Sequence, residues 1–160
     1  RGLGDVYKRQ VHDGGLIFVI GQSGRIVAFN ARSGLPVWER AIGGLEMPWV
    51  SGKSLFVVSL DGRLFALRRD DGAVRWVTEL EGALPAGVFV SEDSLRHFGP
   101  VVAGGRVYVV SGKGNISAFN ADTGEKLESV SVGAPSSTAP QVAAGTMLVL
   151  GSNGTLTVFE

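Results

Sequence analysis

The sequence predicts an all-β protein, a β-propeller with four-stranded antiparallel blades, of which about four are present as a partial ring. The first observation is a pair of glycines ten residues apart that occurs three times, with one further copy of its first member. The second is a short apolar segment between the paired glycines, with an alanine at the same place each time. Successive copies begin 38, 52 and 40 residues apart, a period that is typical of propellers when only strands and turns fill it. The repeat residues are Gly24, Gly34, Trp38, Gly62, Gly72, Trp76, Gly114, Gly124 and Gly154.

Each blade is expected to contain four strands joined by glycine turns. The first strand follows a proline, as at Pro48, Pro100 and Pro140, because the first residue of a strand does not need its N–H for pairing. The second strand is the most apolar, which indicates burial on both faces. Asp-Gly or Asn-Gly follows it in two copies and favours a tight hairpin. The expected second strands are 16–20, 55–60, 107–110 and 147–150, and the third strands are 25–30, 63–68, 115–120 and 155–160.

The repeats also predict the organisation of the chain. The blades are expected at 11–42, 47–80, 98–132 and 138–160, the first and last with three strands each. Residues 81–97 form an insertion between two blades. Residues 1–10 fit no repeat position and are interpreted as a non-native scar or a disordered terminus. Because the pattern starts within a blade, 11–160 is expected to be the C-terminal part of a longer single-domain propeller.

Composition excludes several classes of function. The chain has 15 basic and 15 acidic residues, so it lacks the basic field that attracts nucleic acid or an anionic membrane. Its longest apolar run is about six residues, far below the roughly 18 that a transmembrane helix needs. The absence of cysteine excludes a disulfide framework, a thiolate metal site and a cysteine nucleophile.

Side chains that would support catalysis or bind a metal are few. The two histidines, His12 and His97, lack the spacing that a metal site requires. The acidic turns at Asp61 and 70–72 lack the spacing of a calcium loop, and aspartate is in any case a common turn residue. Ser136 has no histidine base nearby in the sequence. We therefore expect no catalytic residue, no metal ligand and no cofactor-binding residue.

The insertion 81–97 is the candidate for contact with a partner. Loops on rigid scaffolds often carry binding residues, and apolar side chains on a loop can mark an interface. The alternative is that the same side chains cap the neighbouring blade. The candidate contact residues are Leu84, Val88, Phe89 and Val90.

The segments that run from alanine to tryptophan resemble the pyrroloquinoline-quinone-like β-propeller repeat, whose pattern is Ala-x-Asp-x-x-Thr-Gly-x-x-x-Trp. Residues 28–38, 66–76 and 118–128 follow it. In that family the tryptophan docks between adjacent blades, which implies this role for Trp38 and Trp76. The chain departs from the pattern at the aspartate, replaced by Asn30, Arg68 and Asn120, and at the third tryptophan, replaced by Glu128.

Within this family, four short sequence segments resemble those of scaffold subunits in the machinery that assembles outer-membrane β-barrels. The segments are residues 48–50, 55–58, 75–78 and 98–106. The resemblance implies a non-enzymatic role at the periplasmic face of the outer membrane, with the β-barrel subunit of that machinery as partner. It also implies that membrane association occurs only through an upstream lipid anchor. Two alternatives remain open: a fragment of a quinoprotein dehydrogenase that uses pyrroloquinoline quinone, and another envelope propeller that binds a different protein.

Overall fold

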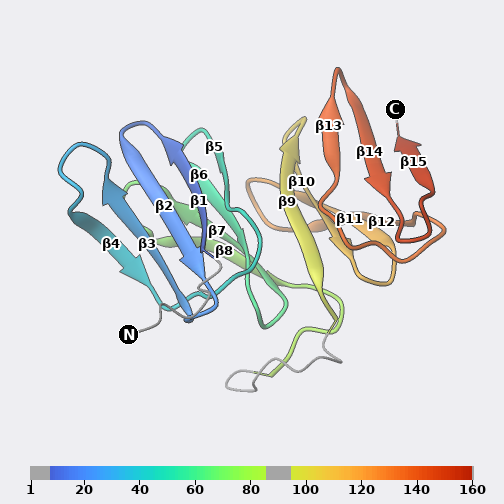
Figure 1. Ribbon diagram of the computed structural model, residues 1–160, viewed down its shortest axis with the longest axis horizontal. Helices are drawn as coiled ribbons and strands as arrows, with labels where there is room; N and C mark the ends of the chain where they lie inside the picture. Colours follow the sequence, from blue (N-terminus) through green and yellow to red (C-terminus); the bar gives the residue numbers. More distant parts are fainter. Residues whose placement is uncertain (1–7, 86–94, 160) are drawn as a thin grey trace.

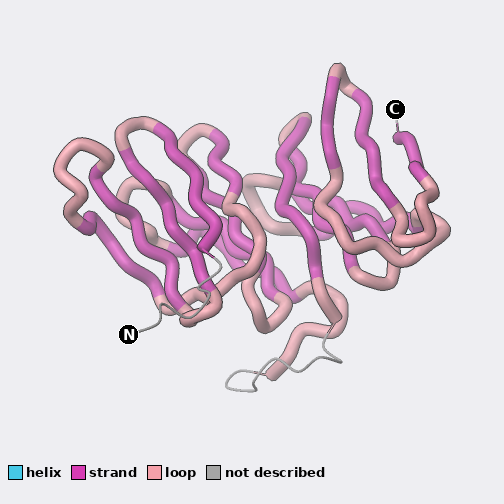
Figure 2. Tube along the Cα trace, viewed as in Figure 1, coloured by secondary structure: helices cyan, strands magenta, loops and turns pink. Residues whose placement is uncertain are grey.

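A computed structural model describes residues 8–85 and 95–159, and every regular element in these ranges is a β-strand (Figure 1, Figure 2). The strands form four antiparallel sheets, each of which is a meander of consecutive strands. No helix within the described ranges is long and apolar enough to cross a membrane. In chain order the strands are β1 Lys8–Asp13, β2 Leu16–Gly21, β3 Arg25–Asn30, β4 Pro36–Arg40, β5 Trp49–Ser51, β6 Ser54–Val58, β7 Arg63–Arg68, β8 Val74–Glu79, β9 His97–Ala103, β10 Arg106–Ser111, β11 Asn115–Asn120, β12 Lys126–Ser131, β13 Gln141–Ala143, β14 Thr146–Leu150 and β15 Leu156–Phe159.

These sheets are the blades of a partial propeller, which confirms the predicted fold class. Blade 1 is β1–β4, blade 2 is β5–β8, blade 3 is β9–β12 and blade 4 is β13–β15. Figure 1 shows them side by side in chain order, with the two chain ends at opposite sides of the molecule. Each blade is joined to the next by a loop that runs from its fourth strand to the first strand of the next blade.

The first blade differs from the prediction. The sequence indicated three strands starting near Val11, but β1 begins at Lys8 and pairs along its whole length with β2, so the blade has four. Residues 8–10, which the sequence analysis assigns to a non-native or disordered terminus, are part of that pairing. Their side chains are polar and carry no apolar alternation, and the backbone hydrogen bonds to β2 are what place them in the sheet. Similarly, β9 begins at His97, which we had assigned to the insertion.

In each of the first two blades, three residues that lie opposite one another on the second, third and fourth strands form a cross-strand row. In blade 1 it joins Phe18, Ala28 and Trp38, and in blade 2 it joins Phe56, Ala66 and Trp76. The phenylalanine and tryptophan rings lie 5.8 Å apart in blade 1 and 5.9 Å apart in blade 2, measured between centroids. The alanine between them is small enough to let the two larger rings approach each other over the middle strand.

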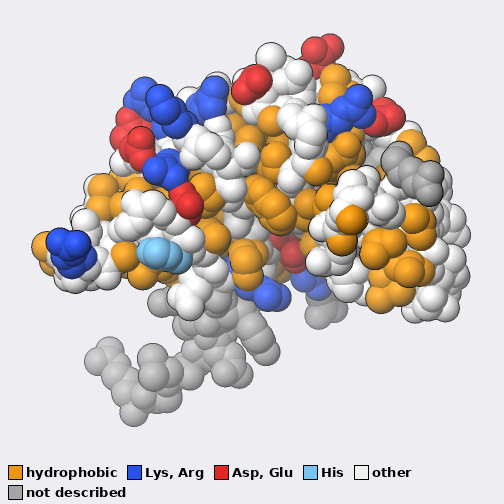
Figure 3. Space-filling view, turned by 90° about the horizontal axis from the view of Figure 1, so that it is seen from above, with side chains coloured by type: hydrophobic (Ala, Val, Ile, Leu, Met, Phe, Trp, Pro, Cys, Tyr) orange, Lys and Arg blue, Asp and Glu red, His pale blue; other side chains and the backbone are white. Residues whose placement is uncertain are grey.

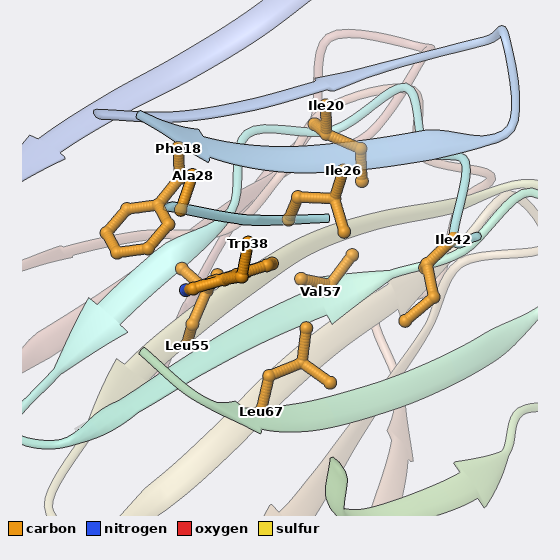
Figure 4. Packing of buried hydrophobic residues seen from close by; sticks show 9 residues of the cluster. All are labelled: Phe18, Ile20, Ile26, Ala28, Trp38, Ile42, Leu55, Val57 and Leu67. Carbon is orange, nitrogen blue, oxygen red and sulfur yellow. The ribbon is translucent and has the colours of Figure 1, made fainter. Parts of the chain in front are cut away.

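The hydrophobic core lies between the blades, in separate clusters. The first cluster joins side chains of blade 1, such as Ile26 and Trp38, to Leu55, Val57 and Leu67 of blade 2 (Figure 4). The opposite face of blade 2 packs on Val107, Val109 and Phe119 of blade 3. Every residue of β6 is buried, which explains why the strand is continuously apolar after Ser54 rather than alternating. Each such side chain contributes about 1.5–3 kcal/mol through burial.

Each tryptophan of the row docks on a turn of the next blade. The Trp38 Nε1 donates a hydrogen bond to the Arg69 carbonyl, 2.8 Å away, and the ring covers Gly72, where a Cβ would lie only 2.6 Å from Trp38 Cε3. The Trp76 Nε1 donates to the Ala121 carbonyl at 3.0 Å. At Gly72 and Gly124, the second glycines of the second and third copies, glycine is therefore needed for the close approach of an indole as well as for its positive φ, which is 67° at Gly72.

Candidate partner-binding surface

The insertion leaves the propeller between β8 and β9, at the lower side of Figure 1. Of its four candidate contact residues, Val88, Phe89 and Val90 lie outside the described residues. Leu84 is half-buried, and its backbone is held at both ends. Its N–H donates to the Asp61 carbonyl at 2.9 Å, and its carbonyl accepts from the Arg63 guanidinium at 3.2 Å. Leu84 is thus fixed against the turn that joins β6 to β7.

Arg63 is the centre of a polar network at this end of the insertion, which we call its first root. Its side chain is only 18% exposed and forms an ion pair with Asp61 and another, at 3.4 Å, with Glu79. The Ser59 hydroxyl hydrogen-bonds to Asp61 and accepts the Arg63 N–H at 3.0 Å. Because the partly buried guanidinium has acceptors on three segments, it holds the turn, β8 and the insertion root in one arrangement.

Blade 3 holds the second end of the insertion, where the Gly112 N–H donates to the Arg96 carbonyl at 2.8 Å, and it also contacts Glu81 at the first end. The Glu81 carboxylate accepts hydrogen bonds from Lys113 Nζ at 3.1 Å and from Asn115 Nδ2 at 3.4 Å. The hydrogen bond from Lys113 is the main reason that the pKa of Glu81 lies below its usual value. His97 lies beside this cluster, and burial lowers the pKa of its imidazole. Its Nε2 atom is buried without a hydrogen-bond partner, so the neutral imidazole is the form that suits this position.

A pocket of about 530 Å³ adjoins the first root. It lies between the turns after β2 and β6 and the loop that leaves β4. Ile42, Leu45 and Phe65 supply an apolar lining, while Ser59 and Asp61 are shared with the polar network. We call the pocket and the two anchored ends of the insertion the root surface, formed by Gln22, Gly24, Phe65 and residues 41–45, 59–63, 80–85 and 95–97. It combines an apolar hollow with charged groups beside it, which is compatible with a protein interface that has an apolar core and a polar rim.

The remaining sequence candidates occupy structural positions. The Asp71 carboxylate pairs with Arg68 and accepts the Ala73 N–H at 2.9 Å, so it shapes a turn; the hydrogen bond from Arg68 lowers its pKa. The Ser136 hydroxyl donates to the Leu150 carbonyl at 2.9 Å. His12 lies exposed on β1. Among the described residues, no group of three or more His, Cys, Asp or Glu side chains is placed to hold a metal.

The sequence predicted the place of the insertion but not the pocket or the Arg63 network. The pocket depends on three loops that are distant in the chain and meet only in the folded structure. Arg63 follows an Asp-Gly pair that we had interpreted as a simple hairpin turn. An arginine directly after such a turn and two residues from an aspartate was the available signal.

Comparisons with known proteins agree with this architecture. The family model described as outer membrane protein assembly factor BamB matches residues 1–78 and 86–160. BamB of Salmonella typhimurium is 26% identical over 158 residues, which is 96% of this chain and 37% of that protein. The chain therefore spans little more than a third of that relative's length.

Solved structures show the same fold. The crystal structure of BamB from Moraxella catarrhalis superposes with a TM-score of 0.69 at 21% identity, over 91% of this chain and 46% of that one. Quinohemoprotein alcohol dehydrogenase from Comamonas testosteroni also gives 0.69, at 18% identity, over 88% of this chain and 28% of that one. At these identities the likeness establishes the propeller fold. Since the family model covers nearly the whole sequence, this chain belongs to the outer membrane protein assembly factor BamB family.

Proposed function

We propose that this chain is part of a non-enzymatic scaffold subunit of the machinery that assembles β-barrel proteins in the outer membrane. The observation that carries the proposal is the match of the BamB family model to two ranges that together span almost all of the sequence. The subunit would act at the periplasmic face of the outer membrane, held there by a lipid anchor elsewhere in the protein. Its partner would be the β-barrel subunit of the complex.

The root surface is the proposed contact with that partner. Docked tryptophans and interblade clusters make the blades a rigid support. The insertion roots project from that support with their backbone fixed by Asp61 and Arg63. A pre-arranged surface loses little conformational entropy on binding, which favours a stable complex.

The likeness to a quinohemoprotein alcohol dehydrogenase supports the fold alone. A quinone site would need carboxylates free to hold calcium. Asp61 and Asp71 are each engaged with an arginine, so they are poorly suited to that role.

The proposal is tested by co-purification of the barrel subunit with the full-length protein that contains this chain. Leu84→Asp places a charge at the insertion root and is expected to weaken binding by at least about thirtyfold, which corresponds to the loss of about 2 kcal/mol that marks an interface hot spot. Leu35→Asp is the matched control, because Leu35 is 66% exposed at the turn after β3, away from the root surface. Failure of the wild-type protein to retain the barrel subunit would contradict the proposed function. Equal retention by both variants would contradict the role of the root surface.

A further inference from the structure

The third blade departs from the first two at its outer strand. Tyr108, Ala118 and Glu128 form the same cross-strand row as the phenylalanine, alanine and tryptophan of blades 1 and 2. Tyr108 occupies the place of the phenylalanine, but a carboxylate stands where the tryptophan would be. The aromatic ring of blade 3 therefore lacks the indole that pairs with its counterparts at 5.8 and 5.9 Å.

The same strand, β12, also lacks a second side-chain contact that joins neighbouring blades at the first two junctions. Arg40 Nε donates to the Gly72 carbonyl at 2.8 Å, and Thr78 Oγ1 donates to the Gly124 carbonyl at 2.7 Å. These two residues lie six positions after the second glycine of their repeats, where blade 3 has Val130. The side chain of Val130 has no donor, and all six residues of β12 are exposed.

A cleft of about 450 Å³ lies between blades 3 and 4 at this position. Tyr108, Ile116 and Ala118 line it from blade 3, and Met147 and Phe159 line it from blade 4. The Arg106 and Glu128 side chains, which also line it, form an ion pair at 2.7 Å and are about half exposed. Its volume falls within the range of sites that hold small organic groups, about 300–1,000 Å³.

The cleft adjoins exposed apolar surface. Val130 is 44% exposed and Val142 is 37% exposed, and both line the cleft. Figure 3 also shows apolar side chains at the end of the molecule that carries β13–β15, where Leu150, Leu156 and Val158 are exposed but do not line the cleft. Exposed apolar side chains at the mouth of a cleft commonly mark a binding site.

We propose that this cleft binds an extended segment of another protein by taking in one of its aromatic side chains, a tryptophan or a tyrosine. The occupant is defined by the two equivalent junctions, each of which is filled by an indole over the same alanine. An incoming ring pairs with Tyr108 and contacts the Met147 thioether. The Glu128 carboxylate accepts the indole N–H or the phenol O–H, which favours these residues over phenylalanine.

The outer strand suits an extended partner as well as a single ring. β12 is the edge strand of its sheet, so one row of its backbone N–H and C=O groups is available to an added strand. The site lies between blades 3 and 4, whereas the root surface lies on turns and loops of blades 1 to 3. The inference therefore goes beyond the proposed function and does not depend on it.

The test uses the 160-residue chain and a peptide that copies its own residues 73–79, AVRWVTE, with the same peptide carrying alanine for tryptophan as control. The chain has two methionines, so ¹³C-methyl labelling gives one signal in the cleft, from Met147, and one reference signal, from Met47. The tryptophan peptide is expected to shift the Met147 signal and leave Met47 unchanged. The alanine peptide is expected to shift neither.

Glu128→Trp supplies the missing indole from the chain itself. It is expected to raise the Tm by about 3–6 °C and to weaken peptide binding at least about tenfold. Glu125→Trp, an exposed turn position nearby, makes the same change in composition and is expected to bind as the wild type does. Tyr108→Leu keeps the cleft apolar but removes the ring, and it is expected to weaken binding severalfold. An unshifted Met147 signal at saturating peptide, or wild-type affinity in both Glu128→Trp and Tyr108→Leu, would overturn the proposal.

Discussion

A glycine at the second glycine position of the repeat can be required for its positive φ or for the close approach of a tryptophan ring. Replacing Gly72 or Gly34 by alanine separates these two requirements. Both residues have a positive φ, 67° and 70° respectively. A Cβ at Gly72 would lie 2.6 Å from the Trp38 ring, whereas a Cβ at Gly34 would meet no atom within 4 Å. Backbone strain costs about 1–2 kcal/mol at either site, and the forced displacement of a packed ring adds about 1–3 kcal/mol. We therefore expect Gly34→Ala to lower the free energy of unfolding by about 1–2 kcal/mol and Gly72→Ala by about 2–5 kcal/mol.

Urea denaturation of the single and double variants measures the difference. Trp38→Ala alone should cost about 3–5 kcal/mol, because it removes a ring that is 8% exposed and its hydrogen bond to Arg69. In that background the clash at Gly72 no longer exists, so Gly72→Ala should cost no more than Gly34→Ala does in the wild type. Equal costs for the two glycine variants in the wild-type chain would refute the docking of Trp38 on this turn. So would an unchanged cost of Gly72→Ala when Trp38 is absent.

Three further predictions follow from contacts elsewhere. Trp76→Ala should lower the free energy of unfolding by about 3 kcal/mol. Val77→Ala, at a side chain that is 49% exposed, should change it by less than about 0.5 kcal/mol. Urea denaturation curves measure both changes. Arg63→Ala should cost about 1–3 kcal/mol, because Asp61 and the Leu84 carbonyl lose their donor; a thermal melt at the wild-type Tm would contradict this. Burial lowers the pKa of His97 from 6.5, so the unfolded chain binds its proton more readily, and stability should fall as pH drops below about 6.5. His97→Gln should reduce that loss between pH 7.5 and 5, and an identical pH profile in the variant would contradict the buried, neutral imidazole.

Much of the fold was predictable because one local rule repeats. A glycine turn needs a positive φ, and a strand buried on both faces must be continuously apolar; both requirements leave direct marks on the sequence. β6 illustrates this, since its apolar run corresponds to a strand buried along its whole length. The start of β1 was missed because Lys8, Arg9 and Gln10 are placed by backbone pairing, which leaves no pattern in side-chain type.

The candidate site was harder to predict because it depends on distant segments. The insertion was visible as a longer step between repeats, yet what fixes its root is a guanidinium of β7 that reaches β8 and Leu84. The loss of the third tryptophan was also visible at Glu128. Its consequence, a cleft beside Tyr108, required the strand register and the position of blade 4.

The root surface is the central functional claim, and amide hydrogen exchange of the full-length protein with and without the barrel subunit tests it most directly. We expect slower exchange on binding at the amide of Leu84 and in the 41–45 loop, the segments that form the root and the pocket. Amides of β14 and β15 in blade 4 should exchange at the same rate in both states. Binding that leaves the root surface unprotected, or no binding by the full-length protein, would contradict the claim.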